Sequence, residues 1–261
     1  MQYFLLYIIA AFAISVKDHV SSYSESQDSK SIEVNSSNII FSESFEGKTP
    51  FKDAYGIETG DWDYALQYVN NPAFRGKKSV RFEIREDQPL VKDGKRAEVI
   101  IIKGLPGKNV WYSFAVYFPS HGFGNDSQRE VFNQWYQNGS PSTSLRVRYD
   151  RMFLETGYER ENRKQIDIGL VVKDTWHEFV LHFIHSHGSD GVIEVWHNGK
   201  LIITHKGGNM YDDVLPKWKI GIYKAAFKNG TSEVTKRILF FDNVKVGNEK
   251  ASYTDMMPSK D

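Results

Sequence analysis

The sequence predicts an all-β protein, folded as a single jelly roll in which two antiparallel sheets pack face to face. From Ile39 onward, short runs of β-branched and aromatic residues alternate with segments containing Gly, Asn, Asp and Pro, which is the spacing of strands and turns. Apolar residues do not recur with helical period for more than about two turns, so helices are expected to be minor. About ten such runs without internal repeats favour one sandwich over two domains.

Nine segments are predicted to contain strands. In chain order they are 79–85, 97–102, 111–118, 144–150, 166–172, 177–185, 191–202, 217–225 and 237–246. Within 191–202, the Asn198-Gly199 pair predicts a two-residue hairpin turn, because both residues tolerate positive φ.

The segment 144–150 combines strand alternation with charge on one face. Period two is expected to place Leu145, Val147 and Tyr149 on one face and Arg146, Arg148 and Asp150 on the other. Guanidinium groups bind carboxylate or sulfate through paired hydrogen bonds. The arginine face is therefore interpreted either as a solvated surface or as a groove for an anionic chain.

The two ends of the chain differ in amino-acid composition from the strand-rich part. An apolar run at 3–16 is too short to span a bilayer and is followed by polar residues, which predicts a signal peptide over 1–22, with an uncleaved anchor as the alternative. Residues 23–38 are read as a polar linker, 39–247 as the jelly-roll domain and 248–261 as a C-terminal tail. The protein is accordingly expected to be secreted.

Composition excludes several classes of function. Lys and Arg number 33, as do Asp and Glu, so the chain has no net charge, which argues against a nucleic-acid binder or a membrane-surface protein. A local basic groove is still allowed. The chain contains no Cys, which excludes disulfides, thiolate zinc sites and a cysteine nucleophile. We expect a monomer without nucleic-acid or membrane partners.

Nine short segments occur in a fixed order along the chain. They are FSESFEG (41–47), GKKSVRFEIR (76–85), GKRAEV (94–99), WYSFAVYFP (111–119), VFNQWYQ (131–137), TWHEFVLHF (175–183), GVIEVWHNGK (191–200), KIGIYKA (219–225) and FFDNVKVG (240–247). Together they resemble the polysaccharide lyases of the jelly-roll type, above all the glucuronan lyase and heparin lyase I-like group, with a looser similarity to alginate lyases of the same fold. The resemblance covers about residues 40–247. It implies a concanavalin-like jelly roll that cleaves a uronic-acid-containing anionic polysaccharide by β-elimination.

β-Elimination sets the list of catalytic groups. The uronate carboxylate must be neutralised, a base must take the C5 proton, and an acid must protonate the departing glycosidic oxygen. The resemblance assigns Arg96 and Gln134 to the carboxylate and Tyr223 to proton transfer, as acid or as acid and base.

Tyr136 stands where many relatives have a histidine as the proposed base. A tyrosine has an ordinary pKa near 10, so as a base it needs a cation close by. Arg96, Arg146 and Arg148 are the candidates for that cation. The alternative is a site that has lost activity and kept binding.

Five further residues are expected to form the substrate-binding surface: Glu98, Trp135, Arg146, Arg148 and Lys224. Glu98 would orient the Arg96 guanidinium from the same strand face, the indole would stack on sugar rings, and the two arginines would hold adjacent uronates or sulfates. The lysine follows Tyr223 and so points to the opposite face, unless a bulge intervenes.

A structural Ca²⁺ is expected between the first and last strands, which are neighbours in jelly rolls of this kind. Glu46 and Asp242 are the expected ligands, with help from Asn243, because carboxylate oxygens suit Ca²⁺. Turn hydrogen bonds are the alternative role for these carboxylates.

Two rival functions remain open. A non-catalytic carbohydrate-binding module would use Trp62, Tyr64, Trp135 and Tyr136 to stack on sugars. A glycoside hydrolase needs paired carboxylates, and the nearest match to the family 16 pattern, 165–169, lacks both glutamates. Which polyuronate is cleaved, and whether internally or from an end, is not readable from the sequence.

Overall fold

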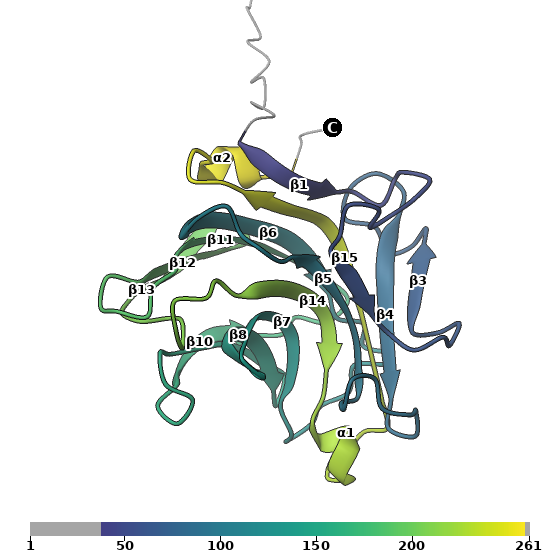
Figure 1. Ribbon diagram of the computed structural model, residues 1–261. Coiled ribbons are helices and arrows are strands. Elements are labelled where there is room, and N and C mark those ends of the chain that lie inside the picture. Colours follow the sequence, from purple (N-terminus) through teal and green to yellow (C-terminus); the bar gives the residue numbers. More distant parts are fainter. Residues whose placement is uncertain (1–37, 259–261) are drawn as a thin grey trace, which may run out of the picture. The chain divides into compact units, whose positions relative to one another are not determined.

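The computed structural model describes residues 38–258, which form two antiparallel sheets stacked as two layers (Figure 1). This confirms the predicted all-β jelly roll. The predicted signal peptide 1–22 and all but the last residue of the linker 23–38 lie outside the described residues.

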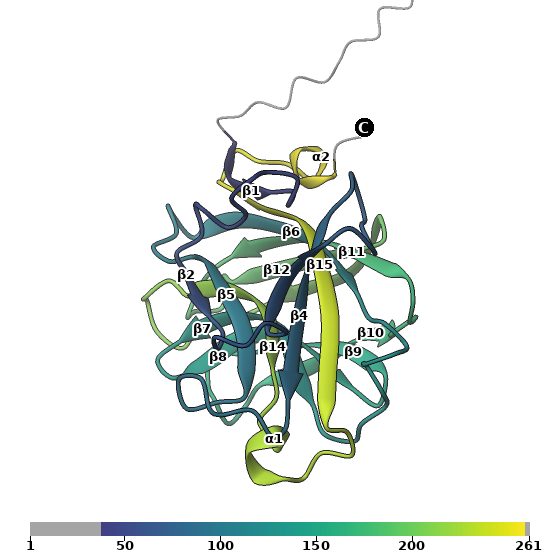
Figure 2. The ribbon, with the colours of Figure 1, turned by 90° about the vertical axis from the view of Figure 1, so that its right-hand side faces the viewer.

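One sheet has eight strands in the order β13-β12-β11-β6-β15-β4-β3, and β1 pairs with the other end of β15. Its strands are β1 (Ile39–Glu43), β3 (Leu66–Val69), β4 (Ser79–Arg85), β6 (Asn109–Tyr117), β11 (Trp176–Ile184), β12 (Val192–His197), β13 (Lys200–Lys206) and β15 (Lys236–Gly247). Figure 2 shows β4 beside β15, whose first half, 236–241, pairs with it.

The second sheet has seven strands in the order β10-β9-β8-β7-β14-β5-β2. They are β2 (Gly56–Glu58), β5 (Arg96–Ile102), β7 (Glu130–Gln137), β8 (Ser140–Arg148), β9 (Arg151–Thr156), β10 (Lys164–Leu170) and β14 (Lys217–Tyr223). Each of the nine predicted segments contains a strand, and β1, β2, β3, β7 and β9 lie outside those segments.

Helices are minor, as expected. The described chain has α1 (Ala226–Asn229), which follows β14, and α2 (Tyr253–Met256), which begins with a capping box between Ser252 and Asp255. The apolar side of α2 packs on the outer face of the eight-stranded sheet through Met256. Part of the segment predicted as a C-terminal tail is therefore docked on the domain. No helix among residues 38–258 is long and apolar enough to cross a membrane.

The turns follow the local chemistry of the chain. Asn198 and Gly199 both have positive φ, 48° and 80°, so the predicted hairpin is confirmed. The strand predicted over 144–150 is wrong at its end. Tyr149 and Asp150 have φ of 51° and 53° and form a second tight turn, which leaves Tyr149 half exposed and not on the buried face.

The core lies between the sheets and is rich in aromatic rings. Trp135 on β7 and Trp218 on β14 are paired in register and are both fully buried. The Trp135 ring stacks 4.3 Å from that of Phe183, and Tyr112 meets both indoles at 5.2 and 4.9 Å. The expectation that Trp135 stacks on a sugar is therefore wrong, because its ring is part of the core.

Gly221 in β14 shows why this strand needs a glycine. Its φ is +124°, and a Cβ there would overlap the backbone carbonyl oxygen of Ala97 and lie 2.7 Å from Glu98 Cα on β5. Gly169 in β10 has nearly the same φ, +127°, with nothing within 4 Å of an added Cβ. A side chain at Gly169 would meet backbone strain alone, whereas one at Gly221 would meet both strain and steric overlap.

We predict that Gly221→Ala lowers the free energy of unfolding by about 3 kcal/mol or more, because strain and overlap add. Gly169→Ala, the matched control, should cost only about 1 kcal/mol from the backbone conformation. Denaturant unfolding of the two variants checks this, and equal losses would show that the overlap at Gly221 relaxes freely.

Candidate functional site

A hollow on the outer face of the seven-stranded sheet gathers most of the predicted site residues. It has a volume of about 180 Å³. Its lining residues are Arg96, Gln134, Tyr136, Gly139, Ser140, Pro141, Arg146, Arg163 and Tyr223. All four predicted catalytic residues are in this set. They come from β5, β7 and β14, which are neighbours in the sheet.

Arg96 and Tyr223 form one wall of the hollow. They are paired in register across β5 and β14, and the Arg96 Cζ lies 4.9 Å from the Tyr223 ring centroid. A Cβ at Gly94 would come within 2.6 Å of the Tyr223 ring and 2.8 Å of Arg96 Nη2. The absence of a side chain at Gly94 therefore makes room for this pair.

Two buried carboxylates hold the Arg96 guanidinium in place. Its Nη1 lies 3.2 Å from Glu98 Oε2 and 3.4 Å from Glu58 Oε2, and the side chain is only 12% exposed. The Arg96 Nε has no hydrogen-bond partner among the described residues. Glu98 thus orients Arg96, as expected, but it is buried and outside the lining of the hollow, so it does not contact substrate there.

Lys219 completes this buried network beneath the hollow. Its Nζ lies 2.6 Å from Glu58 Oε2, and both side chains are buried. Burial acts to raise the pKa of Glu58, but the hydrogen bond and charge of Lys219, helped by Arg96, outweigh it, so that pKa is lowered. For Glu98 burial dominates, and its pKa is raised despite the charges of Lys219 and Arg96.

Gln134 lies between the network and the hollow. It pairs with Lys219 across β7 and β14, and its Nε2 donates a hydrogen bond to Glu98 Oε1. An amide nitrogen has two hydrogens, so one donor remains for a ligand. The contact with Glu98 orients the Gln134 amide toward the hollow as a hydrogen-bond donor.

Tyr136 lies beside two lysines, and of the arginines proposed as its cation Arg96 and Arg146 line the same hollow whereas Arg148 does not. Lys219 Nζ is 4.5 Å and Lys217 Nζ 5.6 Å from the Tyr136 ring centroid. Neither Tyr136 nor Tyr223 makes a side-chain hydrogen bond within residues 38–258. Both tyrosines line the hollow with hydroxyls that the described residues leave available to a ligand.

The arginines of β8 separate into one that lines the hollow and one that does not. Arg146 faces the hollow, and its Nη2 lies 3.0 Å from Glu155 Oε1. Arg148 ends the strand, is exposed, and donates from Nε to the Ser127 carbonyl oxygen at 2.9 Å. Arg148 is therefore not among the residues that line this hollow.

Lys224 is buried and does not reach the outer face. Its Nζ lies 2.5 Å from Glu130 Oε2 and 3.1 Å from Asp126 Oδ2, with Arg237 completing the cluster 3.2 Å from Glu130. All four side chains are at most 1% exposed. The expectation that Lys224 binds substrate is wrong, since its charge is used inside the protein.

Glu46 and Asp242 are held by the same short loop. Glu46 Oε1 accepts hydrogen bonds from the backbone N–H groups of Lys77 and Lys78, both at 2.7 Å. Asp242 Oδ2 accepts from Phe74 N at 2.8 Å and from Arg75 N at 3.1 Å.

These two carboxylates are close enough for the charge of one to act on the other. Burial, helped by the charge of Glu46, raises the pKa of Asp242 to about 6. Neither carboxylate forms an ion pair with a basic side chain in the described part of the chain. The Asp242 Oδ1 also accepts a hydrogen bond from the Asn243 backbone N–H at 2.7 Å, and residues 38–258 contain no group of three or more His, Asp or Glu side chains placed to hold a metal ion. The turn hydrogen bonds expected as the alternative role of these carboxylates are therefore present.

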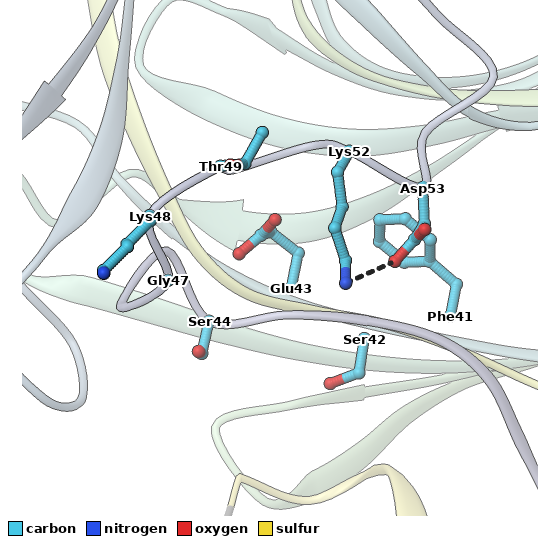
Figure 3. Close-up of a pocket in the computed structure, with 9 residues that line it drawn as sticks. All are labelled: Phe41, Ser42, Glu43, Ser44, Gly47, Lys48, Thr49, Lys52 and Asp53. Carbon is cyan, nitrogen blue, oxygen red and sulfur yellow. Dashed lines mark ion pairs between the residues drawn. The ribbon is translucent and has the colours of Figure 1, made fainter.

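Another hollow, of about 380 Å³, lies at the start of the domain beside β1 (Figure 3). Its carboxylate, Glu43, already accepts backbone hydrogen bonds from Phe45 at 2.7 Å and Phe51 at 2.6 Å. Lys52 and Asp53 pair with each other at 3.8 Å. Both carboxylates of this hollow therefore already contact other groups of the protein, and none of the predicted site residues lines it.

Three residues of the site were not anticipated: Glu58, Lys219 and Arg163. The sequence could have indicated Lys219. It stands between the apolar residues Trp218 and Ile220, so strand alternation places it on the same face as Tyr223. Glu58 comes from the three-residue edge strand β2 and Arg163 from the loop before β10. Neither stands in a local pattern that indicates a site.

Comparison with solved structures finds the same fold in other proteins. The chain is similar in structure to the endo-β-1,4-glucuronan lyase of the fungus Trichoderma reesei, with a TM-score of 0.67 and 16% identity over 84% of this chain and 98% of that one. It is also similar to the catalytic domain of a glycoside hydrolase family 131 protein from Coprinopsis cinerea (TM-score 0.60, 12% identity, 82% and 96% covered). The alginate lyase AlgAT5 of polysaccharide lyase family 7 matches with a TM-score of 0.50 and 16% identity over 72% and 83% of the two chains.

At these identities the structural matches show the shared fold alone. A search of curated proteins finds no significant match to this chain. The family model described as "Polysaccharide lyase" matches residues 46–245, which is most of the chain and contains the whole hollow. The chain therefore belongs to the polysaccharide lyase family and is an enzyme of that class.

Proposed function

We propose that the enzyme cleaves a uronic-acid-containing anionic polysaccharide by β-elimination, in the hollow lined by Arg96, Gln134, Tyr136 and Tyr223. The observation that carries the proposal is that two carboxylate-binding donors and two unpaired tyrosine hydroxyls converge on one small hollow. These are the groups that abstraction of a proton next to a carboxylate requires.

Arg96 and Gln134 would bind the carboxylate of the reacting uronate. A guanidinium and an amide N–H stabilise the negative charge that builds up when the C5 proton leaves. Because Glu98 contacts both side chains, they are oriented before substrate arrives. Such preorganisation lowers the barrier without cost at the moment of reaction.

The tyrosines would move the protons. One phenolate takes the C5 proton, the electron pair forms the C4–C5 double bond, and the C4–O bond breaks as the departing oxygen receives a proton. Tyr223 is the proposed acid, and the Arg96 guanidinium lies beside its ring, 4.9 Å from the centroid. Tyr136, next to Lys219, is the proposed base.

Hydrolysis by paired carboxylates is disfavoured by the same geometry. Glu58 and Glu98 face each other across β2 and β5, but both are buried and neither lines the hollow. Their oxygens contact Arg96, Lys219 and Gln134. A hydrolase needs an acid and a base that flank the glycosidic bond.

We further propose that Glu46 and Asp242 hold a structural Ca²⁺, away from the reacting sugar. Their lack of basic partners and the raised pKa of Asp242 support this proposal. The protein is also proposed to be exported, which is supported by the apolar run at 3–16 and by a polymeric substrate that stays outside cells.

The decisive test of the reaction is ultraviolet absorbance during incubation with a panel of polyuronates. β-Elimination creates a double bond conjugated to the carboxylate, whereas hydrolysis does not. A rising signal on one polymer supports the proposal and names the substrate. New reducing ends without absorbance would point to hydrolysis, and retention on immobilised polyuronate without any products would point to a binding module.

We predict that Tyr223→Phe lowers kcat by about 100-fold or more, because general acid catalysis contributes at least that factor. The change removes one oxygen, so the melting temperature and polymer binding should be nearly unchanged. Tyr68→Phe, on the exposed face of β3, is the matched control and should keep full activity. Full activity of Tyr223→Phe would remove Tyr223 from the mechanism.

We predict that Ca²⁺ raises the melting temperature by several degrees over a chelated sample, since a ligand that binds only the folded state stabilises it. Asp242→Asn should abolish this increment, whereas Asp53→Asn, at an exposed carboxylate, should keep it. Identical melting curves with Ca²⁺ and with chelator would overturn the calcium proposal.

A further inference from the structure

Three arginines surround one buried carboxylate at the edge of the hollow. Glu155 on β9 is 2% exposed, and its Oε2 lies 2.7 Å from Arg129 Nη1. Its Oε1 lies 3.0 Å from Arg146 Nη2 and 3.0 Å from Arg163 Nη1. None of the three arginines forms an ion pair with another acidic side chain in residues 38–258. One carboxylate therefore balances three cations, and the cluster keeps an excess of positive charge.

The cost of this excess is visible at Arg146. Burial lowers its pKa to about 10, and the charges of Arg129 and Arg163 act in the same direction, against that of Glu155. An added anion would relieve this repulsion. A negatively charged ligand would therefore meet a cluster with net positive charge.

The two arginines that line the hollow also keep hydrogen-bond donors for such a ligand. Arg146 uses Nε on Ser144 Oγ at 2.8 Å, and Arg163 uses Nε on the Arg160 carbonyl oxygen at 3.2 Å. Arg146 Nη1 and Arg163 Nη2 have no acceptor among the described residues. A guanidinium presents its nitrogens as a fork that matches carboxylate or sulfate oxygens.

The cluster is close to the proposed reacting centre but is separate from it. Arg146 and Arg163 line the same hollow as Tyr136 and Tyr223. Arg96 lies on β5, three strands away from β8 in the sheet order. Strands are about 4.8 Å apart, so the two backbones are about 14 Å apart, with space for more than one sugar between them.

We propose that Arg146 and Arg163, supported by the charge of Arg129 on the other oxygen of Glu155, form a second anion subsite, which binds the carboxylate or sulfate of a sugar neighbouring the reacting uronate. This inference rests on the proposed function, which places the carboxylate of the reacting uronate at Arg96 and so the neighbouring sugar at the arginine cluster. It makes the preferred substrate a polymer with negative charge on neighbouring sugars, and a polymer with isolated uronates a poor one.

Arg163→Gln and Arg129→Gln test the subsite, because Glu155 keeps two arginine partners in each variant. On a polyglucuronate that carries a carboxylate on every sugar, each variant should raise KM about 10-fold while kcat changes little. The effect should disappear on a partly carboxyl-reduced polymer with isolated uronates. Arg148→Gln, on the same sheet but outside the hollow, is the matched control and should match the unaltered enzyme.

A binding measurement separates this inference from the proposed reaction. The ligand is an oligoglucuronide with a carboxylate on every sugar, and its binding is measured by calorimetric titration of Tyr223→Phe and of the double variant Tyr223→Phe/Arg163→Gln. The double variant should bind about 10-fold more weakly, and its Kd should depend less on salt concentration. If Arg163→Gln weakens binding but the unaltered enzyme cleaves no polymer, the subsite is supported and the proposed reaction is overturned. Unchanged KM and Kd in both variants, with intact melting curves, would overturn the subsite.

The two sources of charge are distinguished by a second ligand. An oligosaccharide that alternates a uronate with a sulfated sugar presents sulfate where the oligoglucuronide presents carboxylate. A larger loss of affinity for this ligand in Arg163→Gln assigns the subsite to sulfate, and a larger loss for the oligoglucuronide assigns it to carboxylate.

Discussion

The alternation of side chains along β7 and β14 is the constraint on which the site depends. Trp135 and Trp218 are paired across these strands and buried in the core, which fixes both strands against the eight-stranded sheet. Period two then turns their neighbours Gln134 and Lys219 to the opposite face. A strand slipped by one residue would bury the charged set and expose the indoles, so the hydrophobic core and the site specify the same register. Gly221 keeps β14 close to β5, where a side chain would overlap the backbone.

The positive charge on the outer face of the seven-stranded sheet comes from an excess of basic side chains held in place by buried carboxylates. The chain has no net charge, yet around the hollow six basic side chains form ion pairs with only three acidic ones. Buried carboxylates are costly unless paired, and here each is held by cations or amide donors. Glu58 and Glu98 orient Arg96, while Glu155 gathers the arginines. The resulting surface is positive and prearranged, as recognition of a polyanion requires.

Much of the fold and part of the site could be predicted from the sequence. Strand alternation and the Asn198-Gly199 pair are local signals, and they located ten of the strands and one hairpin. The ordered motifs placed Arg96 and Tyr223 in one site because neighbouring strands bring their matched positions together. The errors have physical reasons. Trp135 is of a residue type that stacks on sugars, but its position in the strand alternation turns its ring into the core. Lys224 follows the last residue of its strand and is drawn into a buried cluster.

The sequence by itself determined the class of fold, the strand periodicity and the polysaccharide lyase family, because these depend on local patterns and ordered motifs. Only the tertiary structure decided which charged groups share a hollow. Arg163 comes from a loop, Glu58 from a short edge strand, and Glu155 from a strand that follows the turn at Tyr149. Their contacts join residues far apart in sequence, and no local pattern encodes such distances. The same packing separates Arg146 from Arg148, since β8 reaches the hollow with one arginine and ends at the other.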